Sequence, residues 1–508
     1  MNYLIGIDLG TSGTKTILFD EDGRLLASST VEYPMHQPKN GWAEQDPADW
    51  WNAACKTIST VISESGIDAH LIKGVGISGQ MHGLVMLDSG GNVIRDSILW
   101  CDGRTGLECC EITEAIGAER LIQISANPAL VGFTAGKILW VRKNEPQNYE
   151  RCRHILLPKD YIRYMLTGEF ATEVSDASGM NLLDVPGRCW SDVILDKLKI
   201  DKSMLGKVYE SAEITGEITQ RAAGLTGLKA GTPVVGGAGD NAAAAIGTGI
   251  VSAGKAFTTL GTSGVVFAHT DEVTIDPKGR VHTFCSAVPD AWTVMSCTLA
   301  AGLSLQWFRN ECCGKEVAEA ERQGKDPYEI MDELAGKSPV GSNRLIYLPY
   351  LMGERSPLLD EKVRGAFIGL SAMHKKGDML RSIMEGVSFS QRQCIDVLRE
   401  MGIRTNDMIA CGGGGRSPLW RQMLADIYGC PVKTSSTAKV GPAFGACILA
   451  GVGTGVFHSV REACERLVVP DTVTLPDGER SAGYEAYYAL YKSLYPVLKD
   501  SYVLLSKL

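Results

Sequence analysis

"LGTSG" occupies residues 9–13 of this 508-residue chain, and the same five letters return at residues 260–264. Both copies lie between two β-like runs, in "YLIGIDLGTSGTKTILFD" and in "GKAFTTLGTSGVVFAHT". The pattern predicts a strand, a glycine turn and a second strand at both places. An Asp-Gly pair at residues 22–23 predicts a further turn and a third strand in the first copy. Chance recurrence of good turn residues is the alternative, but five identical positions in equivalent contexts favour an internal duplication.

Length and composition restrict the function classes. A chain of 508 residues is too long for one ordinary domain, and 44% hydrophobic with 21% charged residues is typical of globular proteins. The net charge is −9 and no basic cluster stands out, which argues against non-specific binding of nucleic acid or of an anionic membrane. The first residues, "MNYLIGIDLGTSG", lack the basic region of a signal peptide, and no stretch has the apolar length of a membrane span.

The 15 cysteines indicate a reducing compartment, so we expect a cytoplasmic protein. No C-x-x-C spacing occurs among them, which argues against a zinc site. Most of these cysteines are expected to be small buried hydrophobic side chains.

The two turns have the composition of phosphate-binding turns. Glycine lets the backbone approach a ligand, and successive N–H groups in a tight turn bind an anion, with the hydroxyls of Thr11, Ser12 and Thr262 as further donors. "GTSGTKT" lacks the spacing of a Walker loop and leads into a strand instead of a helix. Two such turns, one in each half, predict a nucleotide held between two related domains.

Two charged residues flank the first turn. Asp8 precedes it, and a carboxylate beside phosphates needs a cation such as Mg²⁺ between them, unless Asp8 only caps the turn. Lys15 follows the turn and adds positive charge to the same phosphates, unless it is an ordinary exposed strand lysine.

Three other stretches are rich in glycine. "GVGISG" at residues 74–79 matches G-x-G-x-x-G, but it continues into a strand-like run where a dinucleotide-binding motif needs a helix. "VVGGAGDNAAAAIGTG" at residues 234–249 predicts a strand, a turn and a helix that opens at Asp240, which is either a plain N-cap or a functional carboxylate. "IACGGGGRSPLWRQMLADIYG" at residues 409–429 places four glycines between a strand and an amphipathic helix, where the backbone can approach a purine.

These motifs together resemble the FGGY family of carbohydrate kinases, which belongs with actin and the heat-shock ATPases. The resemblance rests on "IGIDLGTSGTKTILFD", "TLGTSGVV", "GAGDNAAAAIG", "CGGGGRSPLWRQMLAD" and two signature stretches, "GFTAGKILWVRKN" and "GAFIGLSAMHKKGDMLRSIME", and it extends from residue 3 to about residue 455. It implies an α/β fold with two actin-like, ribonuclease H-like ATPase domains that flank a nucleotide and sugar cleft. The implied domains are residues 1–246 and 247–508, with small residues at 247–254 acting as a hinge.

The resemblance also implies a reaction. "SGQMHG" and "LWCDGR" are similar to the members that phosphorylate xylulose, whereas members that phosphorylate glycerol carry an arginine–glutamate pair in place of Met81 and His82. We therefore expect ATP-dependent phosphorylation of D-xylulose to D-xylulose 5-phosphate, with ATP and Mg²⁺ bound. Another ketose or polyol, such as ribulose, remains open as the substrate, as does a homodimer, since family members are often dimers.

The residue roles implied by the resemblance fall into three groups. Asp240 is the catalytic base and Asp8 is the catalytic residue that supports the metal of Mg-ATP. The sugar site is implied to contain Met81, His82, Asp240 and Asn241, although a lone histidine in a strand is more often structural. The nucleotide site is implied to contain Thr11, Ser12, Lys15, Gly261, Thr262, Gly302, Gly413 and Ser417.

A rival of another class is a nucleotide-driven binding machine of the actin or heat-shock type. It predicts a separate peptide-binding module or filament surface after the ATPase core, and the sequence shows no such module. The last stretch, "SAGYEAYYALYKSLYPVLKDSYVLL", has helical apolar spacing, and we expect it to pack on the core without a ligand.

Overall fold

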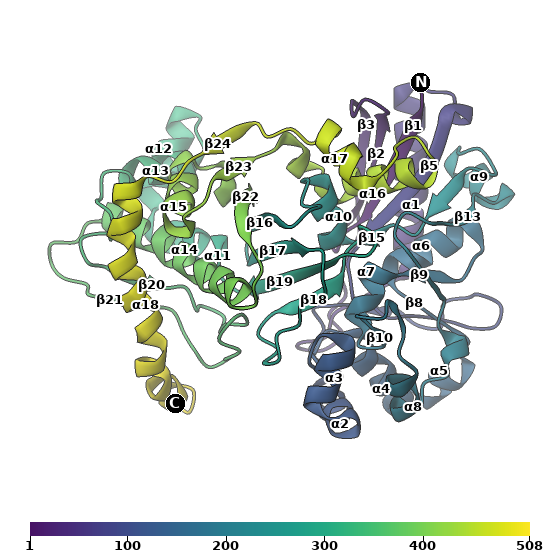
Figure 1. The fold of residues 1–508 in the computed structure, drawn as a ribbon, viewed down its shortest axis with the longest axis horizontal. Coiled ribbons are helices and arrows are strands. Elements are labelled where there is room, and N and C mark those ends of the chain that lie inside the picture. Colours follow the sequence, from purple (N-terminus) through teal and green to yellow (C-terminus); the bar gives the residue numbers. More distant parts are fainter. The chain divides into compact units, whose positions relative to one another are not determined.

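The computed structural model describes residues 1–508, apart from the side chain of Lys439. The chain forms two compact units, which we call unit 1 and unit 2 (Figure 1). Unit 1 consists of Met1–Ser252, Thr270–Thr293 and Thr437–Val469, and unit 2 of Ala253–His269, Val294–Ser436 and Pro470–Leu508. The chain first passes from unit 1 to unit 2 inside the stretch 247–254, whose hinge role stays a prediction.

The main sheet of unit 1 has the order β13-β14-β5-β1-β2-β3, and β15 also pairs with β5. Strands β1, β2 and β3 are antiparallel, while β5 runs parallel to β1, β14 and β15. This confirms the predicted succession of three strands around the first LGTSG turn. The strands are β1 (Tyr3–Leu9), β2 (Gly13–Asp20), β3 (Leu25–Glu32), β5 (Ile72–Gly79), β13 (Ile214–Glu217), β14 (Pro233–Val235) and β15 (Ala238–Gly239).

Helices cover both faces of this sheet. Helix α1 (Pro47–Ser65) starts at Asp46, whose side chain accepts the N–H of Ala48, and ends at Gly66 in the left-handed conformation. Helix α16 (Gly441–Gly453) contacts β1, β5 and α10 (Asp240–Gly247). Its approach is so close that a Cβ on Gly76 of β5 would lie 1.9 Å from the carbonyl oxygen of Ala446.

This close packing explains why the units differ from two consecutive halves. Helix α16 lies far beyond residue 247 in the sequence, yet its small residues bury the sheet of unit 1 together with α17 (Val460–Leu467). Chain order alone does not reveal such a return, because the apolar sequence "GPAFGACILAGVG" fits either unit.

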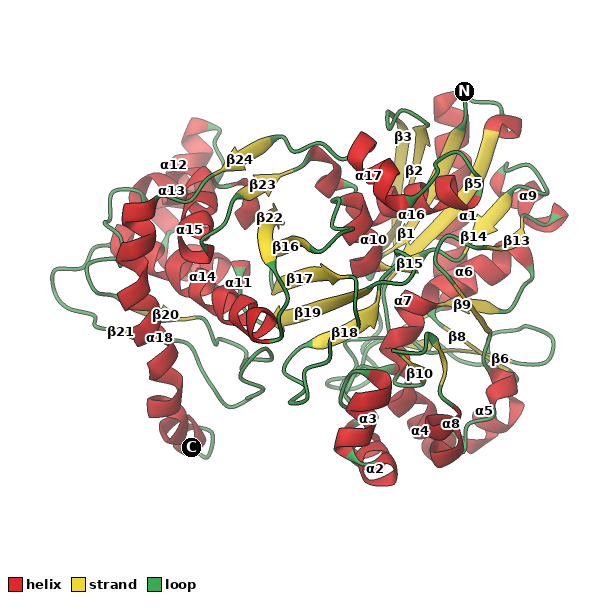
Figure 2. Cartoon of the chain, in the orientation of Figure 1, coloured by secondary structure: helices red, strands yellow, loops and turns green.

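The rest of unit 1 consists of short strands and helices (Figure 2), and many of them pack around a further apolar cluster. The strands are β4 (Glu44–Gln45), β6 (Val85–Leu87), β7 (Ser97–Ile98), β8 (His154–Leu156), β9 (Ala171–Glu173), β10 (Leu183–Asp184), β11 (Cys189–Trp190), β12 (Lys207–Tyr209) and β18 (His282–Cys285). The helices are α2 (Gly106–Ile116), α3 (Ala118–Ser125), α4 (Thr134–Asn144), α5 (Pro146–Arg151), α6 (Pro158–Thr167), α7 (Val174–Ala177), α8 (Asp192–Leu198) and α9 (Gln220–Thr226).

The sheet of unit 2 repeats the arrangement around the LGTSG turn, with the order β19-β17-β16-β22-β23-β24. Strand β16 pairs antiparallel with β17 and parallel with β22, as β1 does with β2 and β5. The strands are β16 (Gly254–Leu260), β17 (Gly264–Thr270), β19 (Trp292–Thr298), β22 (Thr405–Cys411), β23 (Val432–Thr434) and β24 (Thr472–Thr474), with β20 (Ile346–Leu348) and β21 (Ala366–Ile368) paired separately. The shared arrangement supports the predicted duplication.

The helices of unit 2 are α11 (Gly302–Cys312), α12 (Gly314–Gln323), α13 (Pro327–Ala335), α14 (Lys376–Glu400), α15 (Pro418–Tyr428) and α18 (Gly478–Leu505). Helix α14 buries most of its length against α11, α13, α15 and β20. Helix α18 buries four tyrosines, Tyr484, Tyr488, Tyr491 and Tyr502. The expected C-terminal helix is therefore confirmed, and its aromatic residues pack on the protein itself.

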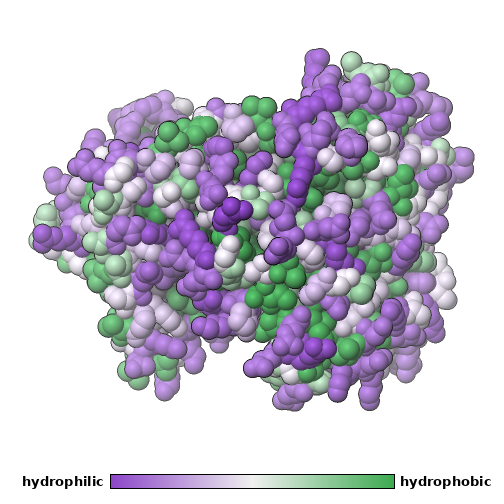
Figure 3. Space-filling view, viewed as in Figure 1, coloured by the Kyte–Doolittle hydropathy of each residue, from purple (hydrophilic) through white to green (hydrophobic). Residues whose placement is uncertain are grey.

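Hydrophilic side chains cover most of the visible face of each unit (Figure 3). Within the described residues, no helix combines the length and the apolar character that crossing a membrane requires. All 15 cysteines are free thiols, and more than half of them are buried, as expected.

Candidate active site

Two carboxylates emerge at the same edge of the unit 1 sheet. Asp8 is the penultimate residue of β1, where it pairs with Ser78 of the parallel strand β5. Ser78 in turn pairs with Ala238 of β15, and Asp240 follows that strand directly. Because β1, β5 and β15 are parallel, their carboxyl ends share one edge, the position where ligands bind in sheets of this kind.

Asp240 is the first residue of α10, and its carboxylate is oriented by its neighbour. The Oδ1 atom accepts the backbone N–H of Asn241 at 2.6 Å and the side-chain amide of Asn241 at 2.9 Å. Oδ2 accepts no hydrogen bond from the described residues. The N-cap position belongs to Gly239, so Asp240 is the first residue inside the helix, and its bond to the first-turn N–H of Asn241 uses Oδ1 and leaves Oδ2 available.

The environment of Asp240 suits a base. Burial, together with the nearby charge of Asp8, raises its pKa to about 7 against the opposing effect of the hydrogen bonds from Asn241. Perturbed carboxylates of this type cluster at functional sites, because a general base works best with a pKa near the working pH.

Asp8 is the second perturbed carboxylate. Burial raises its pKa to about 6, although Ser78 and the cross-strand neighbour Lys15 lower it. Its Oδ1 atom is enclosed by protein and has no hydrogen-bond partner among the described residues. An orphaned carboxylate oxygen at this edge fits a cation ligand. Asp8 stands alone in this respect, since no group of three or more His, Cys, Asp or Glu side chains suited to a metal occurs in the described part of the chain, the surroundings of Asp8 included.

Met81 lies beside the turn of Asp240, although about 160 positions separate the two residues in the sequence. A Cβ on Gly239 would lie 2.9 Å from Cγ of Met81, so the methionine packs directly on the turn that carries Asp240. A Cβ on Gly179 would lie 2.3 Å from Nδ1 of His82. The structure thus brings Met81 to the turn that carries Asp240 and Asn241, and both Met81 and His82 lie against Gly179 in unit 1.

His82 is held in an uncommon conformation. Its φ is +67°, which a non-glycine residue adopts only when the surroundings hold it there. Its ring stacks on Phe133 at a centroid distance of 4.4 Å, and Nδ1 bonds the carbonyl oxygen of Gly179 at 2.8 Å. Its own carbonyl accepts the Lys137 ammonium at 2.7 Å and the Thr134 hydroxyl at 3.1 Å. Such strain points to a functional position.

The first LGTSG turn adjoins this histidine segment. The Thr11 hydroxyl donates to Gln80 at 3.3 Å and accepts the indole N–H of Trp100 at 3.0 Å. The backbone amides of Thr11 and Ser12 donate no hydrogen bond within the described residues, as expected of an anion-binding turn. The Thr11 hydroxyl is therefore occupied by hydrogen bonds to Gln80 and Trp100. The backbone amide of Thr11 is the group that is available to a phosphate.

The second LGTSG turn lies at a cavity of about 780 Å³ in unit 2. Five of the eight residues predicted for the nucleotide line it, namely Gly261, Thr262, Gly302, Gly413 and Ser417. The backbone amides of Thr262 and Ser263 donate no hydrogen bond within the described residues, which repeats the arrangement at Thr11 and Ser12.

The glycines at this cavity have different structural roles. The N–H of Gly302 donates to the carbonyl of Gly261 at 2.7 Å, and a Cβ on Gly302 would lie 2.6 Å from that oxygen. A Cβ on Gly412 would lie 2.9 Å from the backbone of Leu260, so this glycine is needed for packing. Only open space surrounds Gly413, which leaves room for a flat ligand. Ser417 caps α15 by accepting the N–H of Trp420.

The sequence reasoning missed several residues at both sites. In unit 2, Tyr328, Glu329 and Asp332 of α13 line the cavity, and burial raises the pKa of Asp332. No local motif marks them, since they belong to an ordinary amphipathic helix. In unit 1, Trp100 was part of the quoted "LWCDGR", but only the fold shows its bond to Thr11.

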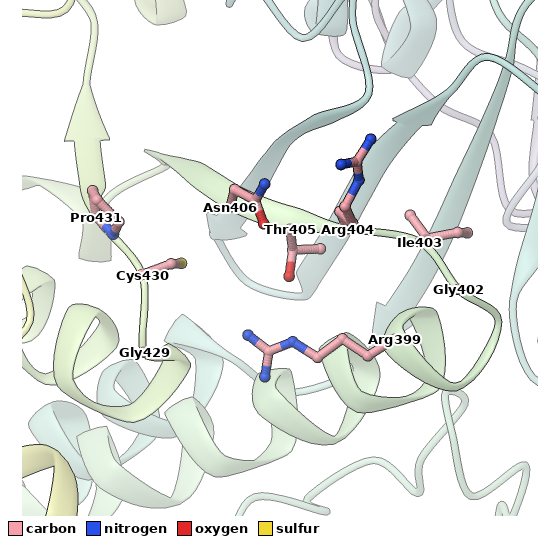
Figure 4. A pocket seen from close by; sticks show the side chains of 9 residues that line it. All are labelled: Arg399, Gly402, Ile403, Arg404, Thr405, Asn406, Gly429, Cys430 and Pro431. Carbon is pink, nitrogen blue, oxygen red and sulfur yellow. The ribbon is translucent and has the colours of Figure 1, made fainter.

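A second cavity, of about 420 Å³, lies at the amino end of β22, the opposite end from the four glycines (Figure 4). It contains Arg399 and Arg404, but the C-terminal ends of α14 and α15 adjoin it, where the helix dipole favours cations over anions. Arg399 donates to the carbonyl of Tyr428 at 2.8 Å, which satisfies the end of α15. This cavity therefore has a structural explanation.

Comparison with known proteins identifies the family. Residues 3–247 match the N-terminal domain, and residues 256–454 the C-terminal domain, of the FGGY family of carbohydrate kinases. The chain belongs to this family. The FGGY kinase fold explains the repeated sheet arrangement, and the family implies that the chain is a carbohydrate kinase that uses ATP.

Individual FGGY kinases are similar over the whole length. The xylulose kinase of Bacillus subtilis is 39% identical over 500 residues, which is 98% of each chain. A "xyloylose kinase" structure from Brucella ovis has a TM-score of 0.90 and 34% identity, and the match covers 98% of this chain and 100% of that one. A gluconate kinase structure from Lactobacillus acidophilus has a TM-score of 0.91 and 27% identity, over 99% of both chains.

Proposed function

We propose that this FGGY kinase is a xylulose kinase, which transfers the γ-phosphoryl group of ATP to D-xylulose and forms D-xylulose 5-phosphate. The observation that supports the proposal most directly is the packing of Met81 against the turn of Asp240, because it places the segment that resembles xylulose kinases beside the candidate base. The full-length similarity to a protein named xylulose kinase supports it.

In the proposed mechanism, Asp240 accepts the proton of the sugar hydroxyl. Asn241 holds Oδ1, so Oδ2 is the atom that takes the proton. A pKa of about 7 leaves Asp240 substantially ionised at neutral pH and still basic enough to remove the proton as the O–P bond forms. Transfer further requires that the γ-phosphate and the hydroxyl meet in line.

Mg²⁺ would neutralise charge on the phosphates of ATP during the transfer. Asp8 is the residue proposed to hold it, directly or through water, because its Oδ1 is buried and unpaired. Magnesium sites in kinases commonly need only one or two carboxylates, since the phosphates supply the other ligands. Lys15, the cross-strand neighbour of Asp8, adds positive charge at the same place.

ATP is assigned to the cavity of unit 2, with the second LGTSG turn beside it. The purine is proposed to lie along Gly413, where nothing obstructs the backbone, with Gly302 and Ser417 alongside. The amides at Thr262 would bind phosphate oxygens there, and those at Thr11 and Ser12 would do so in unit 1.

The sugar is assigned to the neighbourhood of Met81, His82 and Asn241. The ring of His82 is held by stacking and by a bond from one nitrogen, and a side chain fixed in this way discriminates between hydroxyl patterns. Losing hydrogen bonds that a polar site expects can cost ~10⁴-fold in discrimination, so glycerol is a poor substrate in this proposal.

A substrate panel tests the proposal. Purified protein with Mg-ATP is mixed with D-xylulose, D-ribulose, glycerol or gluconate, and ADP release is coupled to an optical signal. We expect kcat/KM for D-xylulose to be far above that for glycerol. Comparable values for the two would contradict the proposal, and a strong preference for D-ribulose would establish the alternative that this is a kinase for another ketose or polyol.

Two further expectations are retained as proposals. We place the protein in the cytoplasm, where ATP is available and free thiols persist, in agreement with the absence of disulfides among the described cysteines. A homodimer is the proposed assembly, and light scattering of the eluted protein would establish its mass.

A further inference from the structure

Five charged side chains form a buried cluster in unit 1 that the proposed mechanism does not use. The Lys159 ammonium lies at its centre, 2.9 Å from Asp160, 3.3 Å from Glu173 and 3.7 Å from Asp176. Arg163 joins it through Asp160 at 3.2 Å. Each of the five is at most 1% exposed, so we call this group the buried ion cluster.

The cluster must balance its charge internally, because burying an unpaired charge is strongly unfavourable. Two cations face three carboxylates. Burial raises the pKa of Asp176 well above its usual range, and neither of its oxygens has a hydrogen-bond partner in the described structure. The raised pKa of Asp176 favours its neutral form, which reduces the excess negative charge of the cluster.

The cluster reaches Asp240 through one serine. Glu173 accepts the backbone N–H and the hydroxyl of Ser175, at 2.7 Å and 2.9 Å. The same hydroxyl accepts the N–H of Gly239 at 3.1 Å. Gly239 is the residue directly before Asp240, so Ser175 holds the Ala238–Gly239 peptide, one peptide before the candidate base.

The cluster also holds the beginning of this turn. Lys159 donates to the carbonyl of Gly236 at 3.5 Å. Ser211 donates its hydroxyl to Glu173 at 2.8 Å, and its carbonyl accepts the N–H of Gly237 at 2.9 Å. Both ends of the short glycine turn are thus bound to one rigid group, although glycine by itself would leave the turn flexible.

We propose that Ser175, held by Glu173 and Lys159 of the buried ion cluster, is a positioning residue that fixes the Gly239 amide and thereby the direction of the Asp240 carboxylate. The inference rests on the proposed role of Asp240 and deepens it. Ser175 does not touch the sugar or ATP. Its contribution is to keep Oδ2 in place, since a displacement of about 1 Å can cost ~10²-fold in rate.

Ser175→Ala tests the proposal, because it removes the acceptor of the Gly239 N–H and changes the volume little. We expect kcat to fall at least tenfold, with KM for ATP unchanged, and the apparent pKa in the kcat profile to move, because the surroundings of Asp240 change. Ser175→Thr keeps the hydroxyl and should restore most of the activity. Ser175→Cys, a weaker acceptor, should give an intermediate rate, and it replaces the alanine variant if that variant does not fold.

Ser125→Ala is the matched control. Ser125 is equally buried in unit 1, but its hydrogen bonds go to Leu121, Asn127 and Asn181 and not to the turn of Asp240. The control should lower Tm by a similar amount and leave kcat within twofold of the parent. If Ser175→Ala behaves as the control does, the cluster only stabilises the fold and the positioning role is wrong.

The parent protein and Asp240→Asn separate this inference from the proposed function. An active parent, an inactive Asp240→Asn and a fully active Ser175→Ala would overturn the inference alone. A fully active Asp240→Asn would overturn the proposed function, and with it the role given to Ser175.

Discussion

Replacing Asp240 by asparagine separates a catalytic base from a structural aspartate. The amide oxygen of asparagine can still accept the two N–H groups of Asn241, now at 2.6 Å and 2.9 Å, so the start of α10 should persist. The amide cannot accept the sugar proton. General-base catalysis contributes ~10²–10⁴-fold, so kcat should fall by at least about 10²-fold while the sugar still binds.

The effect on stability has a definite sign. The pKa of Asp240 in the folded protein, about 7, exceeds the ordinary value of 3.8, so folding disfavours its ionised form. The stability that this group contributes is present at pH below about 4 and is lost as the pH rises through about 7. The asparagine side chain of the variant does not ionise. The gain in Tm of Asp240→Asn over the parent should therefore be larger at pH 8 than at pH 5.5.

The assay combines initial rates by coupled ADP release, calorimetric titration with D-xylulose and thermal melts at the two pH values. Asp201→Asn is the control, since Asp201 is an exposed aspartate of unit 1 whose carboxylate accepts the N–H of Ser203 at the start of a short helix. The control should retain full activity. A kcat of Asp240→Asn within a few-fold of the parent would remove Asp240 from the mechanism, and with it the proposed site in unit 1.

Three other predictions concern the same site. Asp8→Ala should lower kcat sharply and raise the Mg²⁺ concentration needed for half-maximal rate, with the circular dichroism spectrum unchanged; normal turnover in saturating Mg-ATP would exclude the metal role. His82→Ala should raise KM for D-xylulose at least about tenfold with little change in KM for ATP, and equal changes in both would show that His82 is structural. The kcat/KM for the sugar should rise roughly tenfold from pH 6 to pH 8, because Asp240, with a pKa of about 7, goes from about one tenth to about nine tenths ionised over this range. Asp8, whose pKa is about 6, titrates as its coupled partner. A flat pH profile would contradict this prediction.

Much of the fold was predictable from local patterns. The repeated turn, the strands on either side of it and the helix opening at Asp240 follow from glycine placement and apolar runs, and the structure has all of them. The path of the chain between the units was not predictable, because the small residues of α16 pack on unit 1 only through contacts with distant strands.

The candidate site, like the fold, was only partly predictable from the sequence. Asp8 and Asp240 stand out in the sequence because each adjoins a glycine turn. Lys137, Trp100 and Ser175 do not, since their roles arise from bonds to residues far away in the chain, such as Lys137 to His82 and Trp100 to Thr11. The hydroxyl of Thr11 was expected to face phosphate, and its bonds to Gln80 and Trp100 could only be found in three dimensions.

The central claim is that this kinase phosphorylates D-xylulose at its 5-hydroxyl, and analysis of the product tests it most directly. The protein is incubated with Mg-ATP and ¹³C-labelled D-xylulose, and phosphorus–proton correlation spectra are recorded on the products. We expect one phosphomonoester coupled to the two protons on carbon 5, formed in equal amount with ADP, and at least about 10²-fold slower formation of both products in the Asp240→Asn reaction. Release of inorganic phosphate without an ester, or an ester on carbon 1, would contradict it.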